Sequence, residues 1–177
     1  MGQYFNAIAL NDYGNPIKGW VYSHDFGSGL KLMEHSWMKN PFVNAVEGLL
    51  AEGQPWHKSK IVWGGDYADP EPGFKKKYKG KEFELNLYGL CDDKNKVVPP
   101  KIEPFTYQFL INHSKMEYID KNKVPAGNDG WRIHPLPLLT CEGNGQGGGD
   151  YGGDSPLIGH WSRDNISVGN TVPADYK

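Results

Sequence analysis

The sequence predicts an α+β fold: a single domain over residues 1–177, with a largely antiparallel sheet and one principal helix. A chain of 177 residues is long enough for one domain to bury a core without disulfides. Only one segment, about residues 41–52, has both the apolar spacing and the end signals of a helix, against about seven strand-like segments. No internal repeat or linker divides the chain, so these strands indicate one antiparallel sheet.

The N-terminal third predicts a hairpin followed by the principal helix. Residues 3–11 alternate in strand fashion, residues 17–26 are rich in aromatic and β-branched side chains, and the sequence DYGNP between them is a turn signal. Asn40 is a favoured helix N-cap residue, and Pro41 suits the first helical position. Gly53 ends the helix, and we expect its apolar stripe to lie in the core; the stripe consists of Phe42, Val43, Val46, Leu49 and Leu50.

The rest of the chain predicts further strands separated by turns. Residues 131–141 contain Pro135 and Pro137, and we therefore expect an extended edge strand or an irregular strand there. Residues 68–81 have the composition of a loop. Two segments fit both a helix and a strand, and these are residues 29–38 and 83–93. A strand is expected at residues 60–67 and a hairpin at residues 105–120, with its turn at residues 112–114. Residues 157–168 are expected to form a last strand or hairpin.

Composition and charge narrow the compartment and the classes of partner. Cys91 and Cys141 match no metal or redox spacing, so we expect no disulfide framework, no metal site and a cytoplasmic location. The first residues resemble neither a signal peptide nor a membrane span, and we expect no membrane partner. A net charge of -2 provides no general attraction for nucleic acid, which we do not expect as a partner.

The aromatic content of 13%, with six Trp and ten Tyr, is the unusual feature of this polar chain. Such side chains serve as half-buried strand residues or as binding surfaces, and both interpretations stay open. The segments WGGDYAD (63–69) and HWSRDN (160–165) each place a Trp beside polar groups, and a guanidinium can bind a phosphate bidentately. We therefore expect the ligand-binding residues to be Trp63, Asp66, Tyr67, Asp150, Tyr151, Trp161 and Arg163.

The glycine-rich loop at residues 143–154 is part of this expected site. Its glycines would let backbone amides line a pocket or let the loop close over a ligand. It lacks the offsets and the following helix of a phosphate-binding loop, and Pro156 leads into a strand-like segment instead. A functional loop and a passive connector are both compatible with this composition.

Two further clusters suggest alternatives. A metal-dependent hydrolase would need converging histidines and carboxylates, for which the candidates are His24, Asp25, Glu34, His35 and Asp66. Their spacing matches no ligand signature, so structural hydrogen bonds are the competing interpretation. Residues 74–81 carry five lysines interleaved with Phe74 and Tyr78, as in a local nucleic-acid contact. Acidic neighbours offset that charge, and we expect a solvated loop.

The segments KLMEHSW, WGGDYAD and INHSKMEYID, together with the glycine run, resemble small proteins of bacteriophages and bacterial mobile elements, a group with no assigned activity. The resemblance implies a cytoplasmic accessory role, such as anti-defence. We therefore expect a non-catalytic binding protein, without a cofactor, that sequesters a nucleotide-like ligand or blocks a host protein. The alternative is the metal-dependent hydrolase.

Overall fold

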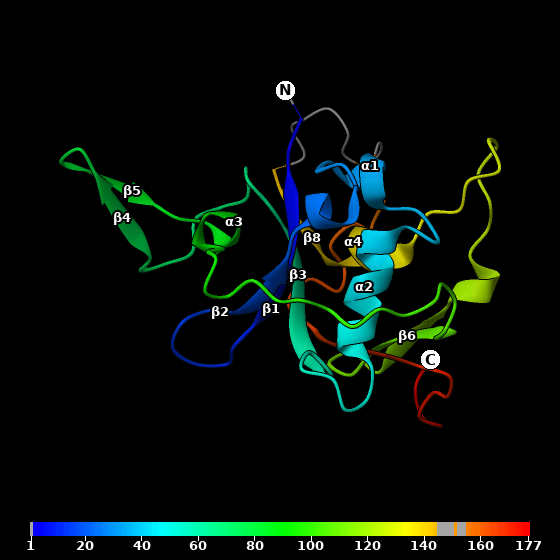
Figure 1. The fold of residues 1–177 in the computed structure, drawn as a ribbon. Coiled ribbons are helices and arrows are strands. Elements are labelled where there is room, and N and C mark those ends of the chain that lie inside the picture. Colours follow the sequence, from blue (N-terminus) through cyan, green and yellow to red (C-terminus); the bar gives the residue numbers. More distant parts are fainter. Residues whose placement is uncertain (1, 145–150, 152–154) are drawn as a thin grey trace.

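The computed structural model describes residues 2–144, 151 and 155–177, and its centre is a seven-stranded sheet (Figure 1). The strand order is β2-β1-β3-β9-β6-β7, and β8 pairs with β3 beside this path. The described strand pairs of this sheet are antiparallel except β3 with β8. The predicted α+β class is therefore confirmed. The strands are β1 (Phe5–Leu10), β2 (Ile17–Val21), β3 (Ser59–Gly65), β6 (Phe109–Asn112), β7 (Glu117–Asp120), β8 (Cys141–Glu142) and β9 (Asn165–Gly169).

The principal helix α2 (Pro41–Leu50) begins as the sequence predicts. The Asn40 side chain accepts hydrogen bonds from the amides of Phe42 and Val43, at 2.9 and 3.2 Å, which satisfies two donors of the first turn. The remaining helices are short: η1 (Ser23–Phe26), α1 (Leu32–His35), α3 (Leu87–Leu90), η2 (Lys121–Lys123) and α4 (Pro135–Thr140).

The sheet is buried on both faces where β1 and β3 run. Phe5, Ala7 and Ala9 of β1 belong to the main core cluster, which also holds the apolar stripe of α2. Ile8 and Leu10 point to the other face and pack in a second cluster with Leu87 of α3. Because alternate side chains of a strand point to opposite faces, the continuous burial of β1 follows from a helix on each side.

The prediction of an irregular strand at residues 131–141 is wrong, because α4 forms there. Pro135 and Pro137 both fall in the first helical turn, where a backbone N–H has no partner within the helix. The Nδ1 atom of His134 accepts the hydrogen bond of the Leu136 amide at 3.1 Å and so caps the helix. Local capping by a histidine therefore makes a helix of a proline-rich segment.

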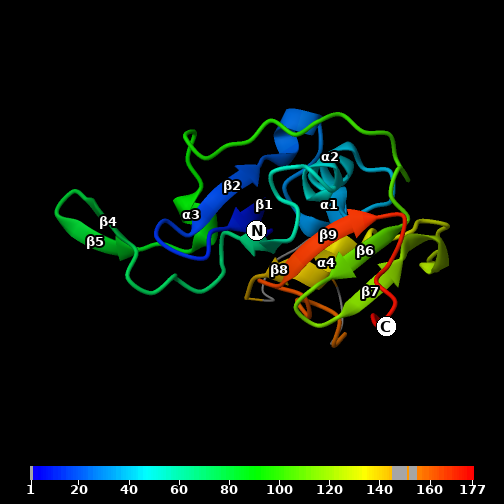
Figure 2. The same ribbon diagram turned by 90° about the horizontal axis from the view of Figure 1, so that it is seen from below.

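Three other segments resolve into short elements. Residues 83–93 divide between the end of β5 (Lys81–Glu84) and α3, and residues 29–38 contain α1. The segment predicted as a loop at residues 68–81 contains β4 (Lys75–Tyr78), which pairs with β5 in a separate two-stranded hairpin. This hairpin projects away from the main body in two perpendicular views (Figures 1 and 2).

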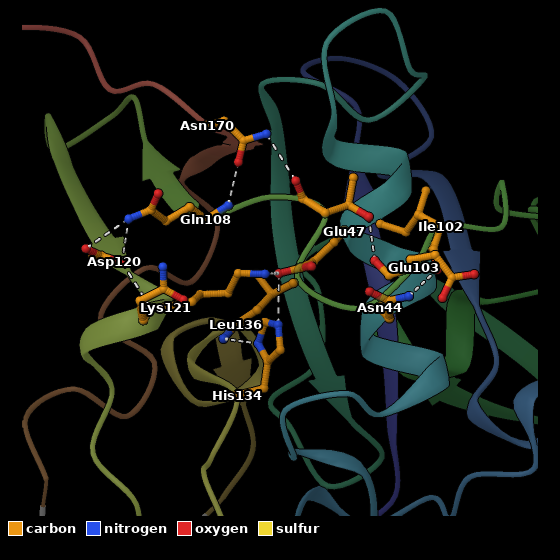
Figure 3. Close-up of polar contacts among 12 residues, drawn as sticks. Asn44, Glu47, Ile102, Glu103, Gln108, Asp120, Lys121, His134, Leu136 and Asn170 are labelled. Atoms are coloured by element: carbon orange, nitrogen blue, oxygen red, sulfur yellow. Dashed lines mark hydrogen bonds and ion pairs between the residues drawn. The ribbon is translucent and has the colours of Figure 1, made fainter.

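A buried polar network joins α2 to η2 and α4 (Figure 3). The Glu47 carboxylate receives hydrogen bonds from Lys121 Nζ at 2.6 Å and from His134 Nε2 at 2.9 Å. All three residues are at most 3% exposed. Burial alone would raise the pKa of Glu47, but His134 and Lys121 outweigh it and hold this pKa below its ordinary value. His134 Nδ1 accepts from the Leu136 amide, so Nε2 is the ring nitrogen that donates to Glu47.

Replacing Glu47 by Gln should lower the free energy of unfolding by roughly 3–5 kcal/mol, because the Lys121 ammonium would stay buried without its counter-charge. Urea denaturation measures this change. Glu52→Gln removes a carboxylate from an exposed residue just beyond the same helix, and it should change stability by at most about 0.5 kcal/mol. A similar small effect in both variants would contradict the role given to Glu47.

Candidate functional site

The two tryptophans expected at the ligand site lie in the main core. Trp63 and Trp161 are 0% and 1% exposed, and the ring of Tyr151 packs against the same cluster. Trp63 Nε1 donates to His35 Nε2 at 2.9 Å, and Trp161 Nε1 donates to Glu117 Oε2 at 2.8 Å. Trp63 and Trp161 are therefore core side chains, Tyr151 packs on that core, and both indole N–H groups are satisfied by the protein.

The Arg163 guanidinium is already bound to two carboxylates. Its Nε and Nη2 atoms donate to Glu142 at 2.7 and 2.9 Å, and its other edge pairs with Glu71. Hydrogen bonds to Glu142 and Glu71 raise the pKa of Arg163 above its ordinary value. Two negative charges on one guanidinium leave no excess positive charge there for a phosphate. Arg163 instead ties the turn before β9 to β8 and to the loop at Glu71.

Two further expected ligand-binding residues, Asp66 and Tyr67, directly follow β3. Asp66 accepts a hydrogen bond from the Tyr4 amide at 2.9 Å and so fixes the end of β3 against the N-terminal strand. Tyr67, next to it, is 39% exposed. Asp150 and most of the glycine-rich loop lie outside the described residues.

Most residues of the hydrolase alternative interact with other groups of the protein instead of converging on one site. Asp25 pairs with Lys96 Nζ at 2.7 Å, and Glu34 accepts from the Lys31 amide at 3.0 Å in a capping interaction. His24 is exposed on η1. In the part of the chain that the structure describes, no group of three or more His, Cys, Asp or Glu side chains could hold a metal ion.

His35 is a fully buried core histidine held in one tautomer. Its Nδ1 atom donates to the Gly29 carbonyl at 2.9 Å, and its Nε2 atom accepts from Trp63. Because Nε2 is an acceptor, the ring is neutral. Burial lowers the pKa of His35 from 6.5 to about 4, against the weaker opposing effects of the Gly29 carbonyl and Glu34.

A groove of about 770 Å³ on the outer side of α2 is the feature that sequence reasoning missed. One wall is the crossing segment, residues 93–103, which runs over α2 on the side away from the sheet (Figures 1 and 2). The other walls come from η1 and the first half of α2. We call this feature the α2 groove; its apolar lining consists of Phe26, Pro41, Ala45, Val97, Val98, Pro99, Pro100 and Ile102.

The crossing segment is fixed at both ends. At its start, the Trp20 amide donates to Asn95 O at 3.1 Å, and the Val97 amide donates to Trp20 O at 2.9 Å. At its end, Asn44 Nδ2 of α2 donates to the Ile102 carbonyl at 2.5 Å (Figure 3). The segment therefore forms a defined wall although it has no regular secondary structure between these points.

Gly48 allows the crossing segment to lie close to the helix. A Cβ atom at this position would stand 3.2 Å from Pro100 Cγ and 3.4 Å from Ile102 Cγ2. These distances are tight for carbon atoms, so any side chain here would press on the segment. The absence of a side chain at this helix position thus lets the crossing segment pack directly on α2.

The charges around the α2 groove do not favour an anion. Its lining carries the carboxylates of Asp25, Asp93 and Glu103 and the ammonium groups of Lys96 and Lys101. Lys96 is also shared, because it pairs with Asp25. Three carboxylates against two ammonium groups suit a neutral or weakly cationic occupant rather than a phosphate.

A second cavity, of about 550 Å³, is lined by a pair of tryptophans. The Trp37 and Trp131 rings lie 5.4 Å apart between centroids, and Trp131 is 58% exposed. Met33 and Pro125 also line this cavity, and Asp129 is its charged residue. The tryptophans with accessible surface are therefore not the two that the sequence singled out.

Comparisons with protein-family models, with curated proteins and with solved structures found no match. None of the helices in the described ranges has the length and apolar character needed to cross a membrane.

The stability of the protein should fall between about pH 7 and pH 5 because of His35, by about 2 kcal/mol. The unfolded chain takes up a proton near pH 6.5, whereas the folded chain does so only near 4, so acid favours unfolding over this range. Urea denaturation at several pH values measures the change. His35→Asn should be less stable than the wild type at neutral pH, and the gap should narrow by the same amount as pH falls.

The control is His24→Asn, which alters an exposed histidine and should keep the wild-type pH profile. A constant gap between the wild type and His35→Asn at all pH values would show that His35 does not carry this pH dependence.

Proposed function

We propose that the protein is a non-catalytic binding protein and that the α2 groove receives a largely apolar segment of a partner protein. The observation that carries the proposal is the groove itself, with a volume and an apolar lining typical of ligand-binding clefts. Val98, on the groove wall, is 92% exposed. An exposed aliphatic side chain beside an apolar cleft is typical of a surface that a partner covers.

The charge distribution supports a protein partner over a nucleotide-like ligand. The α2 groove carries an excess of carboxylates, and the Arg163 guanidinium is occupied by Glu71 and Glu142. A bound phosphate would therefore meet repulsion in the groove or would have to displace two carboxylates from Arg163. An apolar peptide segment would not be repelled by the carboxylates of the groove, and it would not need to displace Glu71 and Glu142 from Arg163.

The partners of the candidate catalytic residues support binding over hydrolysis. The expected carboxylates serve as a capping group, an ion-pair partner and an acceptor for a strand amide. His35, the buried histidine of the set, has both ring nitrogens engaged within the core. A general base needs an atom free to reach a substrate proton, and these side chains are committed to the fold.

The resemblance to proteins of bacteriophages and mobile elements suggests the biological role of this binding. We infer a cytoplasmic accessory protein that blocks a host protein, including anti-defence roles. Cys91 and Cys141 are not joined to each other in a disulfide, which suits a reducing compartment.

A photo-crosslinking residue in place of Val98 should form a discrete protein adduct in the native host. Tyr13 is the matched control position, because it is 93% exposed but lies in the β1–β2 turn, outside the groove lining. Mass spectrometry of the adducts is the measurement. Adding Ile102→Glu to the Val98 variant should remove the adduct, because it places a carboxylate on the apolar wall, while circular dichroism checks that the fold is retained.

The same adducts at both positions, or an adduct unaffected by Ile102→Glu, would refute the groove as the binding site. The absence of any adduct at position 98 in the host would count against it equally.

Divalent metals separate this proposal from the hydrolase alternative. Mn²⁺, Mg²⁺ or Zn²⁺ at millimolar concentration should shift the melting temperature by less than about 1 °C, because a ligand stabilises only the protein that binds it. Differential scanning fluorimetry measures this shift. A rise of several degrees that Asp66→Asn abolishes would instead favour the hydrolase.

A further inference from the structure

The β4–β5 hairpin is a lysine-rich arm outside the core. All eight strand residues are exposed, and the turn between them has positive φ at Lys79 and Gly80, as in the tightest hairpin turns. Its stem is fixed, because the Leu85 amide donates to Phe74 O at 3.0 Å and the Glu71 amide donates to Leu85 O at 2.8 Å. Core packing therefore does not explain the side chains of the arm.

The register separates the charges of the arm onto two faces. Residues that pair directly across antiparallel strands share a face, and neighbours along a strand alternate. Lys75 pairs with Glu84, and Lys77 pairs with Glu82. This face therefore holds two lysines and two glutamates, and we call it the neutral face. Lys75 Nζ also lies 3.4 Å from Glu82 Oε2. Glu82 and Glu84, two of the acidic residues that offset the lysines in the sequence, thus neutralise the lysines of one face only.

The opposite face is basic and aromatic. Here Lys76 pairs with Phe83, and Tyr78 pairs with Lys81. Tyr78 is 60% exposed and Phe83 is 49% exposed. The Lys79 ammonium adds a third positive charge, 5.4 Å from the centre of the Tyr78 ring. We call this the basic-aromatic face; none of its strand residues carries a carboxylate.

We propose that the basic-aromatic face binds single-stranded nucleic acid. Its three ammonium groups would contact phosphates, and Tyr78 and Phe83 would stack on unpaired bases. Proteins that bind single strands without sequence preference combine cationic groups with exposed rings in this way. Two features favour a single strand over other polyanions. Tyr78 and Phe83 can stack only on bases whose faces are open, as they are in a single strand. A polyanion without bases would contact the lysines but would leave both exposed rings without a stacking partner. The site is separate from the α2 groove, so the proposal does not rest on the function proposed above.

The size of the face sets the expected strength and salt dependence. Same-face residues along a strand are about 6.7 Å apart, so the face spans only a few nucleotides and should bind weakly. Three phosphate contacts predict that the logarithm of the association constant falls with the logarithm of salt concentration with a slope of about -2.

Fluorescence anisotropy with a labelled oligothymidylate and the full chain at low salt tests this proposal. Lys76→Gln with Lys81→Gln removes two charges from the basic-aromatic face. Lys75→Gln with Lys77→Gln is the matched control, because it removes two charges from the neutral face of the same arm. The first double variant should reduce affinity about tenfold or more, and the control by at most about threefold.

The rings have a test of their own. Tyr78→Ala and Phe83→Ala should each weaken binding at least about fivefold, in line with the loss of one stacked base. Both side chains are exposed, so the melting temperature should be unchanged. A duplex of the same length should bind more weakly than the single strand and should be insensitive to either substitution.

Several outcomes would overturn the proposal. These are no binding of the wild type to the oligothymidylate, equal losses in the two lysine double variants, or equal binding of duplex and single strand. Vesicles containing phosphatidylserine are the last comparison: binding to them without binding to the oligonucleotide would assign the arm to an anionic membrane surface instead. None of these results affects crosslinking at Val98, so the two proposals fail independently.

Discussion

The buried network of Glu47, Lys121 and His134 is the constraint on which the arrangement of this protein depends. It fixes the rotation of α2 about its own axis, because a charged side chain in the core tolerates only the orientation that brings it to its partners. Asn44 and Gly48 lie three residues before and one residue after Glu47 on the same helix. With Glu47 held inward, these two residues face the crossing segment, and the α2 groove follows from that orientation.

Local signals in the sequence were sufficient for the parts of the fold that local chemistry decides. The cap at Asn40, the proline at the first helical position and the apolar stripe predicted α2 correctly, and alternation predicted the first hairpin. The helix at Pro135–Thr140 was missed because its cap is the ring nitrogen of His134, a residue held in place by Glu47 from a distant part of the chain. A tertiary contact therefore decided a local structure.

The candidate site was harder to predict, because exposure is a property of the packed protein. The segments around Trp63 and Trp161 combine rings with polar groups in the sequence, yet the polar partners of both indoles are supplied inside the protein. The crossing segment has no hydrophobic periodicity, so nothing in its sequence marked it as the wall of a groove. The lysines of residues 74–81 looked neutralised in the sequence, and only the strand register shows which lysines face carboxylates.

Gly48 links the stability of α2 to the shape of its outer surface. A glycine inside a helix weakens it by roughly 1 kcal/mol relative to alanine, so this helix keeps a weak point where the crossing segment touches it. The helix and the crossing segment consequently stabilise each other. The segment covers the helical turn at Gly48, and the missing side chain at Gly48 leaves room for the segment to pack there. An alanine at this one position would strengthen the helix in isolation but would press on Pro100 and Ile102, so the overlying chain would have to move outward.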